Sequence, residues 1–395
     1  MLFVTKLLRF KKELSAFIPQ PVKNILRVYE RKILRSQLIR QVVLKLSGLG
    51  NSNSFESDID TISKSDLIRL DYYSPLHLQG MDREDAIWRY VWLWAIGVGQ
   101  RKLFPGFHPG IYLEQHGVER VGVDPLADYL RAGQPQGPWN FKLITSDEDD
   151  RPLTPMLRIG LHIHAYYLDL FPEIFDRLRR NAVRPDLLIS VTSESARLAI
   201  AAHLETYEGV LVDIRIVPNR GRDIGPLLTE FGETIRQKYD LIGHLHTKKA
   251  PHIKEESIGR GWNQFLLENL LGGQAPMADI ILGRMADDQD VMMVFPDDPN
   301  VLGWGENFCI GEKLLSSLGV KYPYQELCFP IGTMFWARTA GLKALFDLHL
   351  QWEDYPEEPL AHDGTLLHAL ERLFGIFATY RGGSILQTNV SGSTR

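Results

Sequence analysis

Short apolar runs alternate with helically spaced stretches in the middle of the chain. Runs of strand length are predicted at 157–165, 187–192, 211–217 and 239–245. A helix is predicted at 170–181, and the four-residue spacing of Leu227, Phe231 and Ile235 predicts another. Strands that alternate with helices in this way are typical of βαβ units. The pattern therefore predicts an α/β fold with a mostly parallel sheet.

Charged and polar residues follow the last two of these strands. The first cluster is Asn219-Arg220-Gly221-Arg222-Asp223, and the second is His244-Leu245-His246-Thr247-Lys248-Lys249. Ligands of open α/β sheets bind outside the carboxyl ends of the strands, so we expect the two clusters at neighbouring points on one rim. Four cationic side chains and two imidazoles at such a rim suit a diphosphate. The sequence thus predicts an enzyme that handles phosphate groups.

These clusters also have plainer interpretations. Arg220, Arg222 and Asp223 could form a solvated turn with a local ion pair, which contributes little energy. His244 and His246 share one face of a strand and could chelate a metal, but two ligands make an incomplete site. A hydrogen-bonded structural role is therefore favoured for the two histidines.

Six segments occur in a specific order with sensible gaps. They are LRIGLHIHAYYLDLFPEIFDRL (157–178), DLLISVTS (186–193), VPNRGRDIGPLL (217–228), KYDLIGHLHTKK (238–249), FPIGTMFWAR (329–338) and LLHALERLFG (366–375). Through them the chain resembles the rhamnan synthesis protein F family of bacterial polysaccharide glycosyltransferases, from about Arg158 to Phe377. The segment 107–139 also resembles the preamble of such catalytic domains, with Asp128-Tyr129 where the preamble usually has His-Tyr.

The resemblance implies the nucleotide-sugar-binding α/β fold that glycosyltransferases call GT-A. In that fold an Asp-x-Asp sequence at a strand end usually holds a divalent metal against the donor diphosphate, whereas this chain has His244-Leu245-His246 there. Cationic side chains can neutralise a leaving diphosphate in place of a metal, and Arg220, Arg222, Lys248 and Lys249 are available. We therefore predict no metal site and no certain cofactor, with a divalent metal as the disfavoured alternative.

Transfer of a sugar also needs a general base for the acceptor hydroxyl, typically a carboxylate. The candidates are Asp363, which opens a helix predicted at 365–374, and Glu371 within that helix. An ordinary helix cap is the alternative for Asp363, and an ion pair with Arg372 is the alternative for Glu371.

The segment 329–338 combines glycine with large aromatic residues. Aromatic faces stack on sugar rings and glycine permits close approach of the backbone, although large aromatics also dominate cores. The resemblance favours Gly332, Thr333 and Trp336 as a wall of the donor or acceptor site. The predicted substrate-binding set is His164, Tyr166, Thr192, Asn219, Arg220, Arg222, Asp223, His244, His246, Lys248, Lys249, Gly332, Thr333 and Trp336.

Charge divides the chain unevenly. Residues 1–50 hold 11 Lys and Arg against 2 Asp and Glu, a net +9, whereas the rest hold 33 against 47, a net −14. Lys23, Arg27, Arg31 and Arg35 are four apart beside an apolar face, which predicts a basic amphipathic helix on an anionic membrane surface. A helix that packs on protein is the alternative. The acidic remainder has no recognisable nucleic-acid module, so nucleic acid is not an expected partner.

Composition breaks divide the chain into five predicted parts. They are a basic amphipathic arm (1–50), a linker (51–65), a small mostly helical accessory region (66–150), the GT-A-like domain (151–383) and a C-terminal tail (384–395). The two cysteines form no Cys-x-x-Cys pair, and we expect a reducing compartment. No apolar stretch has the length of a membrane span.

We therefore predict a cytoplasmic glycosyltransferase, peripheral on the inner face of the plasma membrane, that extends a lipid-linked surface polysaccharide such as O-antigen, rhamnan or capsule. The resemblance favours a rhamnosyltransferase with dTDP-rhamnose as its nucleotide-sugar donor. The alternative is a catalytically silent scaffold that binds polysaccharide or partner enzymes, which the missing Asp-x-Asp favours.

Overall fold

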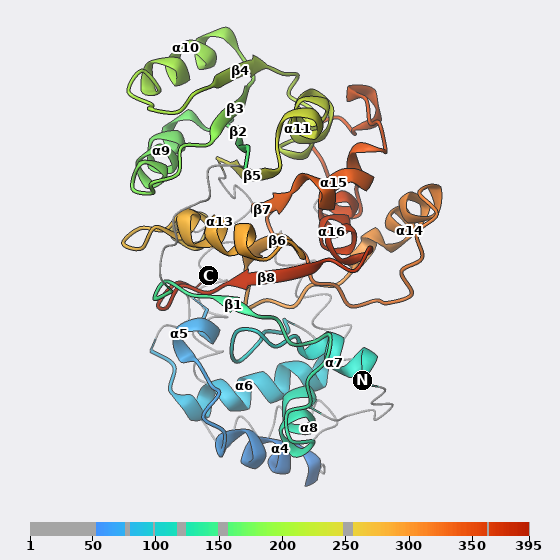
Figure 1. Cartoon of the computed structure of the whole chain (residues 1–395). Helices are drawn as coiled ribbons and strands as arrows, with labels where there is room; N and C mark the ends of the chain where they lie inside the picture. The colour runs from blue at the N-terminus through green and yellow to red at the C-terminus, as the bar shows by residue number, and fades with distance from the viewer. Residues whose placement is uncertain are drawn as a thin grey trace.

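The computed structural model describes residues 53–75, 80–97, 99–116, 124–148, 157–247, 256–361 and 363–394. The predicted arm, Lys248 and Lys249 lie outside the described residues. An α/β domain lies above a smaller helical unit in Figure 1, and β1 and β8 lie on the side of the sheet that faces this unit.

One eight-stranded sheet organises the α/β domain, in the order β1-β8-β6-β7-β5-β2-β3-β4. Its strands are β1 (Leu143–Ile144), β2 (Ile159–His164), β3 (Asp186–Val191), β4 (Val212–Ile216), β5 (Leu241–His246), β6 (Val291–Pro296), β7 (Phe335–Arg338) and β8 (Ser384–Thr388). Strand β7 is antiparallel to β5 and β6, and the other neighbouring pairs are parallel. The predicted α/β class with a mostly parallel sheet is confirmed.

Helices cover both faces of the sheet. One face packs against α9 (Phe171–Arg179), α10 (Glu194–His203), α12 (Glu256–Leu270) and α13 (Met277–Asp287). The other packs against α11 (Gly232–Lys238), α14 (Phe308–Ser317), α15 (Thr339–Phe346) and α16 (Leu366–Thr379). The short helices are η2 (Leu168–Leu170), η4 (Gly305–Asn307) and η5 (Trp352–Asp354). Burial on both faces explains why β2, β3 and β5 read as mostly apolar runs, whereas the edge strand β4 is partly exposed.

The helix predicted around Leu227, Phe231 and Ile235 is present but divided. Pro226–Glu230 form one π-helical turn, labelled η3, and α11 begins at Gly232. The three apolar side chains are still buried together in the core. Such π-helical turns occur frequently at functional sites, and this one directly follows the Asp223 cluster.

The helical unit consists of α4 (Asn53–Ser63), α5 (Leu70–Tyr73), α6 (Arg83–Ile96), α7 (Pro109–Gln115) and α8 (Pro125–Arg131). Helix α4 replaces most of the predicted linker 51–65. Phe55 and Ile62 are buried beside Trp88, and Asp58 forms an ion pair of 2.6 Å with Arg131 of α8. The polar composition of the segment concealed this apolar stripe, whose seven-residue spacing is that of a helix face.

The predicted domain limits also change at both ends of the sheet. Strand β8 comes from the segment predicted as a tail, 384–395, and pairs with β6 and β1. Strand β1 comes from the predicted accessory region, so that region contributes an edge strand to the sheet. Ile385 and Leu386 of β8 are buried on opposite faces, in the two hydrophobic clusters of the domain. The sheet therefore depends on residues outside the predicted limits 151–383.

A buried ion pair joins the helical unit to the sheet. Lys102 Nζ contacts Asp297 Oδ1, and the side chains are 5% and 0% exposed. The other carboxylate oxygen of Asp297 accepts a hydrogen bond of 2.6 Å from the backbone N–H of Gly106. Asp297 directly follows β6, so the contact fixes the loop 101–106 against the sheet.

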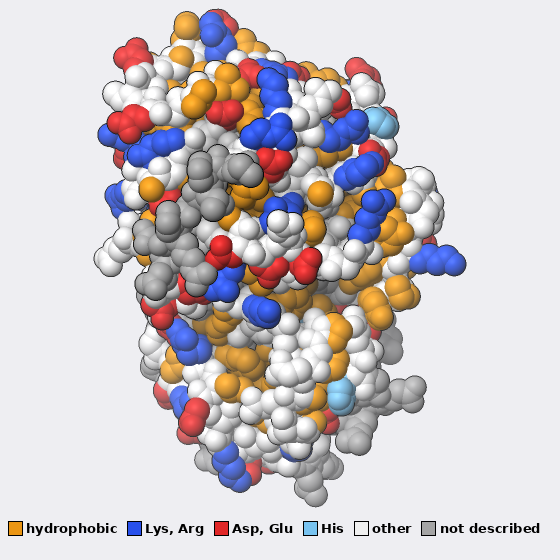
Figure 2. Space-filling model, viewed as in Figure 1, with side chains coloured by type: hydrophobic (Ala, Val, Ile, Leu, Met, Phe, Trp, Pro, Cys, Tyr) orange, Lys and Arg blue, Asp and Glu red, His pale blue; other side chains and the backbone are white. Residues whose placement is uncertain are grey.

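The described surface of the α/β domain carries charges of both signs. Figure 2 shows acidic and basic side chains interspersed over the visible face of this domain. Within the parts of the chain that the structure describes, none of the helices has the length and apolar character needed to cross a bilayer.

Candidate active site

The candidate site lies where the sheet order changes direction. From β2, the chain adds β3 and β4 on one side and then returns to place β5 on the other side of β2. Such a switch point opens a crevice at the carboxyl ends of the two central strands, where α/β folds bind ligands. Here β2 ends at His164 and β5 ends at His246.

Four histidines lie together on one face of these two strands. His162 pairs with His244, and His164 pairs with His246, in the parallel register of β2 and β5. Alternate residues of a strand point to the same face, so all four imidazoles are on one side of the sheet. All four side chains are buried.

A continuous set of side-chain contacts, which we call the histidine row, runs from His164 to Asp223. His164 Nδ1 lies 2.8 Å from Ser190 Oγ, and Ser190 Oγ lies 3.1 Å from His162 Nε2. His162 Nδ1 lies 2.9 Å from His244 Nδ1, and His244 Nε2 lies 3.4 Å from Asp223 Oδ2. The row therefore consists of His164, Ser190, His162, His244 and Asp223.

Apolar neighbours keep the middle of the row away from water. The ring of Phe231 lies 5.3 Å from that of His162, and the ring of Phe335 lies 5.5 Å from that of His244. Burial lowers the pKa of His162 well below its usual value, and the neighbouring imidazoles of His244 and His164 lower it further. Burial also lowers the pKa of His164 to about 4. At neutral pH both side chains are uncharged, because burial disfavours the charged form.

A sharp turn brings Asp223 to the row. Gly221 has a φ of +76°, and a Cβ there would lie 2.8 Å from the Cα of Gly225. Arg222 has a φ of +48°, which is uncommon for a residue other than glycine. Asp223 Oδ2 lies 3.8 Å from His246 Nε2, in addition to its contact with His244. Asp223 of the first predicted cluster thus meets His244 and His246 of the second, although β3 and β2 separate β4 from β5 in the sheet.

A second turn approaches the row from the segment before β7. His246 Nε2 donates a hydrogen bond of 2.8 Å to the carbonyl oxygen of Gly332. The N–H of Gly332 donates a bond of 2.7 Å to Glu371 Oε1. Thr333 follows with a φ of +58°, a strained conformation for a β-branched residue. Strained residues cluster at functional sites, and Arg222 and Thr333 both adjoin this one.

Of the two predicted base residues, only Glu371 is connected to the histidine row. Glu371 reaches the row through Gly332, and its Oε2 also accepts a bond of 3.0 Å from Arg372. Asp363 accepts a bond of 2.6 Å from Asn307 Nδ2 and lies 3.9 Å from Arg372. Although burial opposes ionisation of Asp363, its contacts with Asn307 and Arg372 lower its pKa below the usual value. Asp363 thus anchors η4 to the start of α16.

The two arginines of the turn have different partners. Arg220 donates to the carbonyl oxygens of Tyr355, at 2.6 Å, and Glu353, at 3.0 Å. Arg222 forms an ion pair of 3.0 Å with Glu358 at the surface, where its side chain is 39% exposed. Asn219 and Tyr166 are exposed, and Thr192 is half-buried just beyond the end of β3.

Trp336 does not lie at the site. Its side chain is fully buried on the opposite face of the sheet, and its indole N–H donates a bond of 3.0 Å to the carbonyl oxygen of Leu270. A Cβ at Gly243 of β5 would lie 2.7 Å from the indole ring, so the ring occupies the space that this glycine leaves. Trp336 therefore does not form part of the predicted wall, because the two-residue period of a strand directs its side chain into the core.

Hydrogen-bond partners occupy three of the four ring nitrogens of His244 and His246. A metal ligand must offer a lone pair, and His246 Nε2 offers none because it donates its proton to the carbonyl oxygen of Gly332. His244 has Asp223 beside one ring nitrogen and His162 beside the other. Among the described residues, no group of three or more His, Cys, Asp or Glu side chains is arranged to hold a metal ion.

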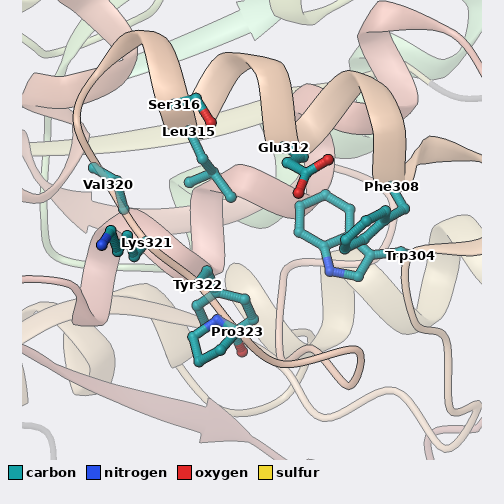
Figure 3. A pocket seen from close by; sticks show the side chains of 9 residues that line it. All are labelled: Trp304, Phe308, Glu312, Leu315, Ser316, Val320, Lys321, Tyr322 and Pro323. Carbon is teal, nitrogen blue, oxygen red and sulfur yellow. The ribbon is translucent and has the colours of Figure 1, made fainter.

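A separate hollow of about 200 Å³ lies beside α14. Figure 3 shows Phe308, Glu312 and Leu315 of the helix on one side and Tyr322 and Pro323 on the other. Trp304 lies at one end and connects the hollow to η4, which Asp363 anchors. None of the predicted site residues lines it.

Sequence reasoning missed two members of the histidine row. His162 and Ser190 are polar residues inside strands that are otherwise apolar. The two-residue spacing of His162 and His164, repeated by His244 and His246, was a signal that one face of two strands is polar. Only the parallel register of β2 with β5 and β3 shows that these residues meet.

A family model described as rhamnan synthesis protein F matches residues 131–382, more than half of the chain. The chain belongs to the rhamnan synthesis protein F family. Membership connects it with the synthesis of rhamnan and, more broadly, of polysaccharide. The rhamnan synthesis protein F match includes the histidine row, both turns and Glu371. It leaves out α4 to α7, all of α8 but its last residue, and β8.

Two relatives are from Xanthomonas campestris pv. campestris and carry the description "Uncharacterized protein WxcX". The protein of strain B100 is 31% identical over 223 residues, which is 56% of this chain and 31% of that protein. The protein of strain ATCC 33913 is 30% identical over 223 residues, with the same shares. The matched part therefore spans about a third of the length of these relatives.

Proposed function

We propose that the protein is a glycosyltransferase that moves a sugar from a nucleotide-diphosphate donor to a growing polysaccharide. The position of the histidine row carries the proposal, since His164 and Asp223 lie at the switch point between β2 and β5. Nucleotides bind α/β sheets at such points. The family name favours rhamnose as the sugar. We extend the proposal to dTDP-rhamnose as donor and a lipid-linked glycan as acceptor.

The arrangement of the sheet supports the GT-A form of this fold. The order β4-β3-β2-β5 makes a nucleotide-binding half, to which the donor's nucleotide would bind. The Gly332 turn leads into the reversed strand β7 and contacts the row through His246. The Gly332 turn thereby borders the same rim, where a sugar acceptor would enter.

Cationic side chains would neutralise the leaving diphosphate. Arg222 is a suitable described cation because its ion pair with Glu358 is at the surface, where such pairs are weak. Arg220 instead holds two backbone carbonyls and orders the turn. Lys248 and Lys249 follow β5 directly in the sequence and stay predicted ligands of the diphosphate. Asp363 and Glu371 stay predicted bases.

Replacement of Arg222 by alanine should weaken binding of the nucleotide-sugar donor. Loss of one charge-assisted contact costs about 1.5–3 kcal/mol, or roughly 10- to 150-fold in Kd. Calorimetric titration with dTDP-rhamnose measures this. Arg236→Ala is the matched control, because Arg236 is 37% exposed and also ion-paired, with Glu233 and Asp347. Equal affinities of the Arg222→Ala and wild-type proteins would place the diphosphate elsewhere.

The predicted arm, residues 1–50, would hold the enzyme at an anionic membrane where its lipid-linked acceptor resides. Each well-placed basic residue contributes about 1 kcal/mol of attraction, which fades as salt rises. The full chain should therefore sediment with vesicles that contain an anionic lipid at low salt, and a chain that lacks 1–50 should not. Equal sedimentation of both chains would remove the membrane role and leave the arm as a segment that packs on protein.

The hollow beside α14 favours a second candidate function, a scaffold that binds polysaccharide without catalysis. Its half-buried aromatic side chains Phe308 and Tyr322 suit sugar rings, and binding there would need none of the histidines. Incubation with a panel of nucleotide sugars and a glycan acceptor separates the two functions. Release of free nucleoside diphosphate from one donor is the result expected of the transferase. Glycan binding without release from any donor would favour the scaffold.

A further inference from the structure

The contacts of the histidine row fix where its protons lie. A neutral imidazole has one N–H donor and one lone-pair acceptor, so each ring must donate on one side and accept on the other. Asp223 is a carboxylate and only accepts hydrogen bonds, so His244 Nε2 must carry a proton and donate to it. With one proton on each ring, His244 Nδ1 is then the acceptor for His162 Nδ1–H.

The same reasoning continues along the rest of the row. His162 Nε2 therefore carries no proton and accepts a hydrogen bond from the hydroxyl group of Ser190. Ser190 Oγ in turn accepts from His164 Nδ1–H. His164 Nε2 is therefore left with a lone pair. One carboxylate at Asp223 thus sets the proton positions of three histidines.

The lone pair of His164 lies at the switch point. His164 is the last residue of β2 and retains 6% exposure, whereas His162 and His244 have none. Its Nε2 makes no hydrogen bond to a described residue. This nitrogen is also not one of the fully buried polar atoms that lack a hydrogen-bond partner in the described part of the chain. Tyr166, two residues on, is 43% exposed, and its ring lies 6.4 Å from that of His164. The atom is therefore reachable from the rim.

We propose that the histidine row is a proton relay. His164 Nε2 receives the proton of the acceptor hydroxyl at one end, and Asp223 receives the proton of His244 Nε2 at the other end. The inference rests on the proposed glycosyltransferase function and names its general base. The acceptor oxygen forms a bond to the anomeric carbon as the bond from that carbon to the diphosphate oxygen breaks. The diphosphate leaves with the bonding electron pair.

Each member of the relay then passes on one proton. His164 Nδ1–H moves to Ser190, the Ser190 proton moves to His162 Nε2, and His162 Nδ1–H moves to His244 Nδ1. His244 Nε2–H moves to Asp223, which becomes neutral. No imidazolium has to persist in the buried row, whose environment disfavours a charged ring. Ser190, His162, His244 and Asp223 are positioning residues in this arrangement, since only His164 touches the substrate.

Nuclear magnetic resonance of the full chain with ¹⁵N-labelled histidine tests the relay without any substrate. Long-range proton–nitrogen correlations at neutral pH report which ring nitrogen carries the proton. We expect Nδ1–H for His162 and His164 and Nε2–H for His244. A proton on Nε2 of His164, or on both nitrogens of His244, would overturn the proposal.

Two variants test the direction in which the hydrogen bonds of the histidine row run. Asp223→Leu removes the fixed acceptor and should move the protons to Nε2 of His162 and His164 and to Nδ1 of His244. Ser190→Ala should remove the preference of His164 alone and leave His162 and His244 as in the wild type. Unchanged proton positions in both folded variants would show that the row is not coupled. If Asp223→Leu does not fold, the wild-type and Ser190→Ala spectra still decide.

Donor titration of the same wild-type sample separates this inference from the proposed function. If the proton positions are as expected but the protein neither binds nor consumes any nucleotide sugar, the proposed transferase function is refuted. Only the hydrogen-bond arrangement of the histidine row then stands. Donor consumption together with Nε2–H at His164 would refute the relay and leave the transferase standing.

Discussion

Replacement of His164 by asparagine should slow sugar transfer by about 10²–10⁴-fold, the usual contribution of a general base. The asparagine amide N–H can take the place of His164 Nδ1–H and keep the 2.8 Å contact with Ser190. What it removes is the Nε2 lone pair. Because the substitution retains the buried contact, donor affinity and folding should change little, and the loss should appear in kcat.

The measurement compares initial rates at saturating donor with donor affinity from calorimetry. His203→Asn is the matched control, because His203 lies on α10 outside the row and is exposed. Glu371→Gln and Asp363→Asn are made in parallel, since these carboxylates are the other predicted bases. Full activity of His164→Asn, together with loss of activity in either carboxylate variant, would assign the base to Glu371 of α16 or to Asp363, three residues before that helix begins.

Replacement of Lys102 by methionine should destabilise the protein by about 3–5 kcal/mol, because it leaves the charge of Asp297 buried without its partner. The loss should appear as a lower midpoint of urea-induced unfolding. The helical unit should also separate from the sheet more readily, since the ion pair links the loop 101–106 to the end of β6. Lys64→Met is the control, because its ion pair with Asp60 is exposed and such pairs contribute little.

The double variant Lys102→Met with Asp297→Leu identifies the cause. If the buried unpaired charge is responsible, the double variant should recover part of the stability, although the N–H of Gly106 then loses its acceptor. A single variant as stable as the wild type would mean that Asp297 finds another partner or is neutral in the fold.

The apolar periodicity by itself determined the α/β class and the strands β2, β3, β4 and β5 to within a few residues. This succeeded for β2, β3 and β5 because they are buried on both faces and read as mostly apolar runs between turn residues, and for the partly exposed edge strand β4 because its apolar residues alternate with charged ones. The same reasoning predicted that the Asp223 cluster and the two histidines of β5 meet. The reasoning failed at α4, whose composition is polar, and at β8, which lies near the end of the sequence. The burial of both elements depends on partners distant in the chain.

The histidine row was decided by the tertiary structure alone. Sequence spacing shows that His162 and His164 share a face, but only the parallel register of β2 between β5 and β3 places them against His244 and Ser190. The same register directs Trp336 to the opposite face, into the core. Periodicity fixes which side of a strand a residue occupies, whereas strand order fixes what it meets there, because pairing joins segments that are remote in the chain.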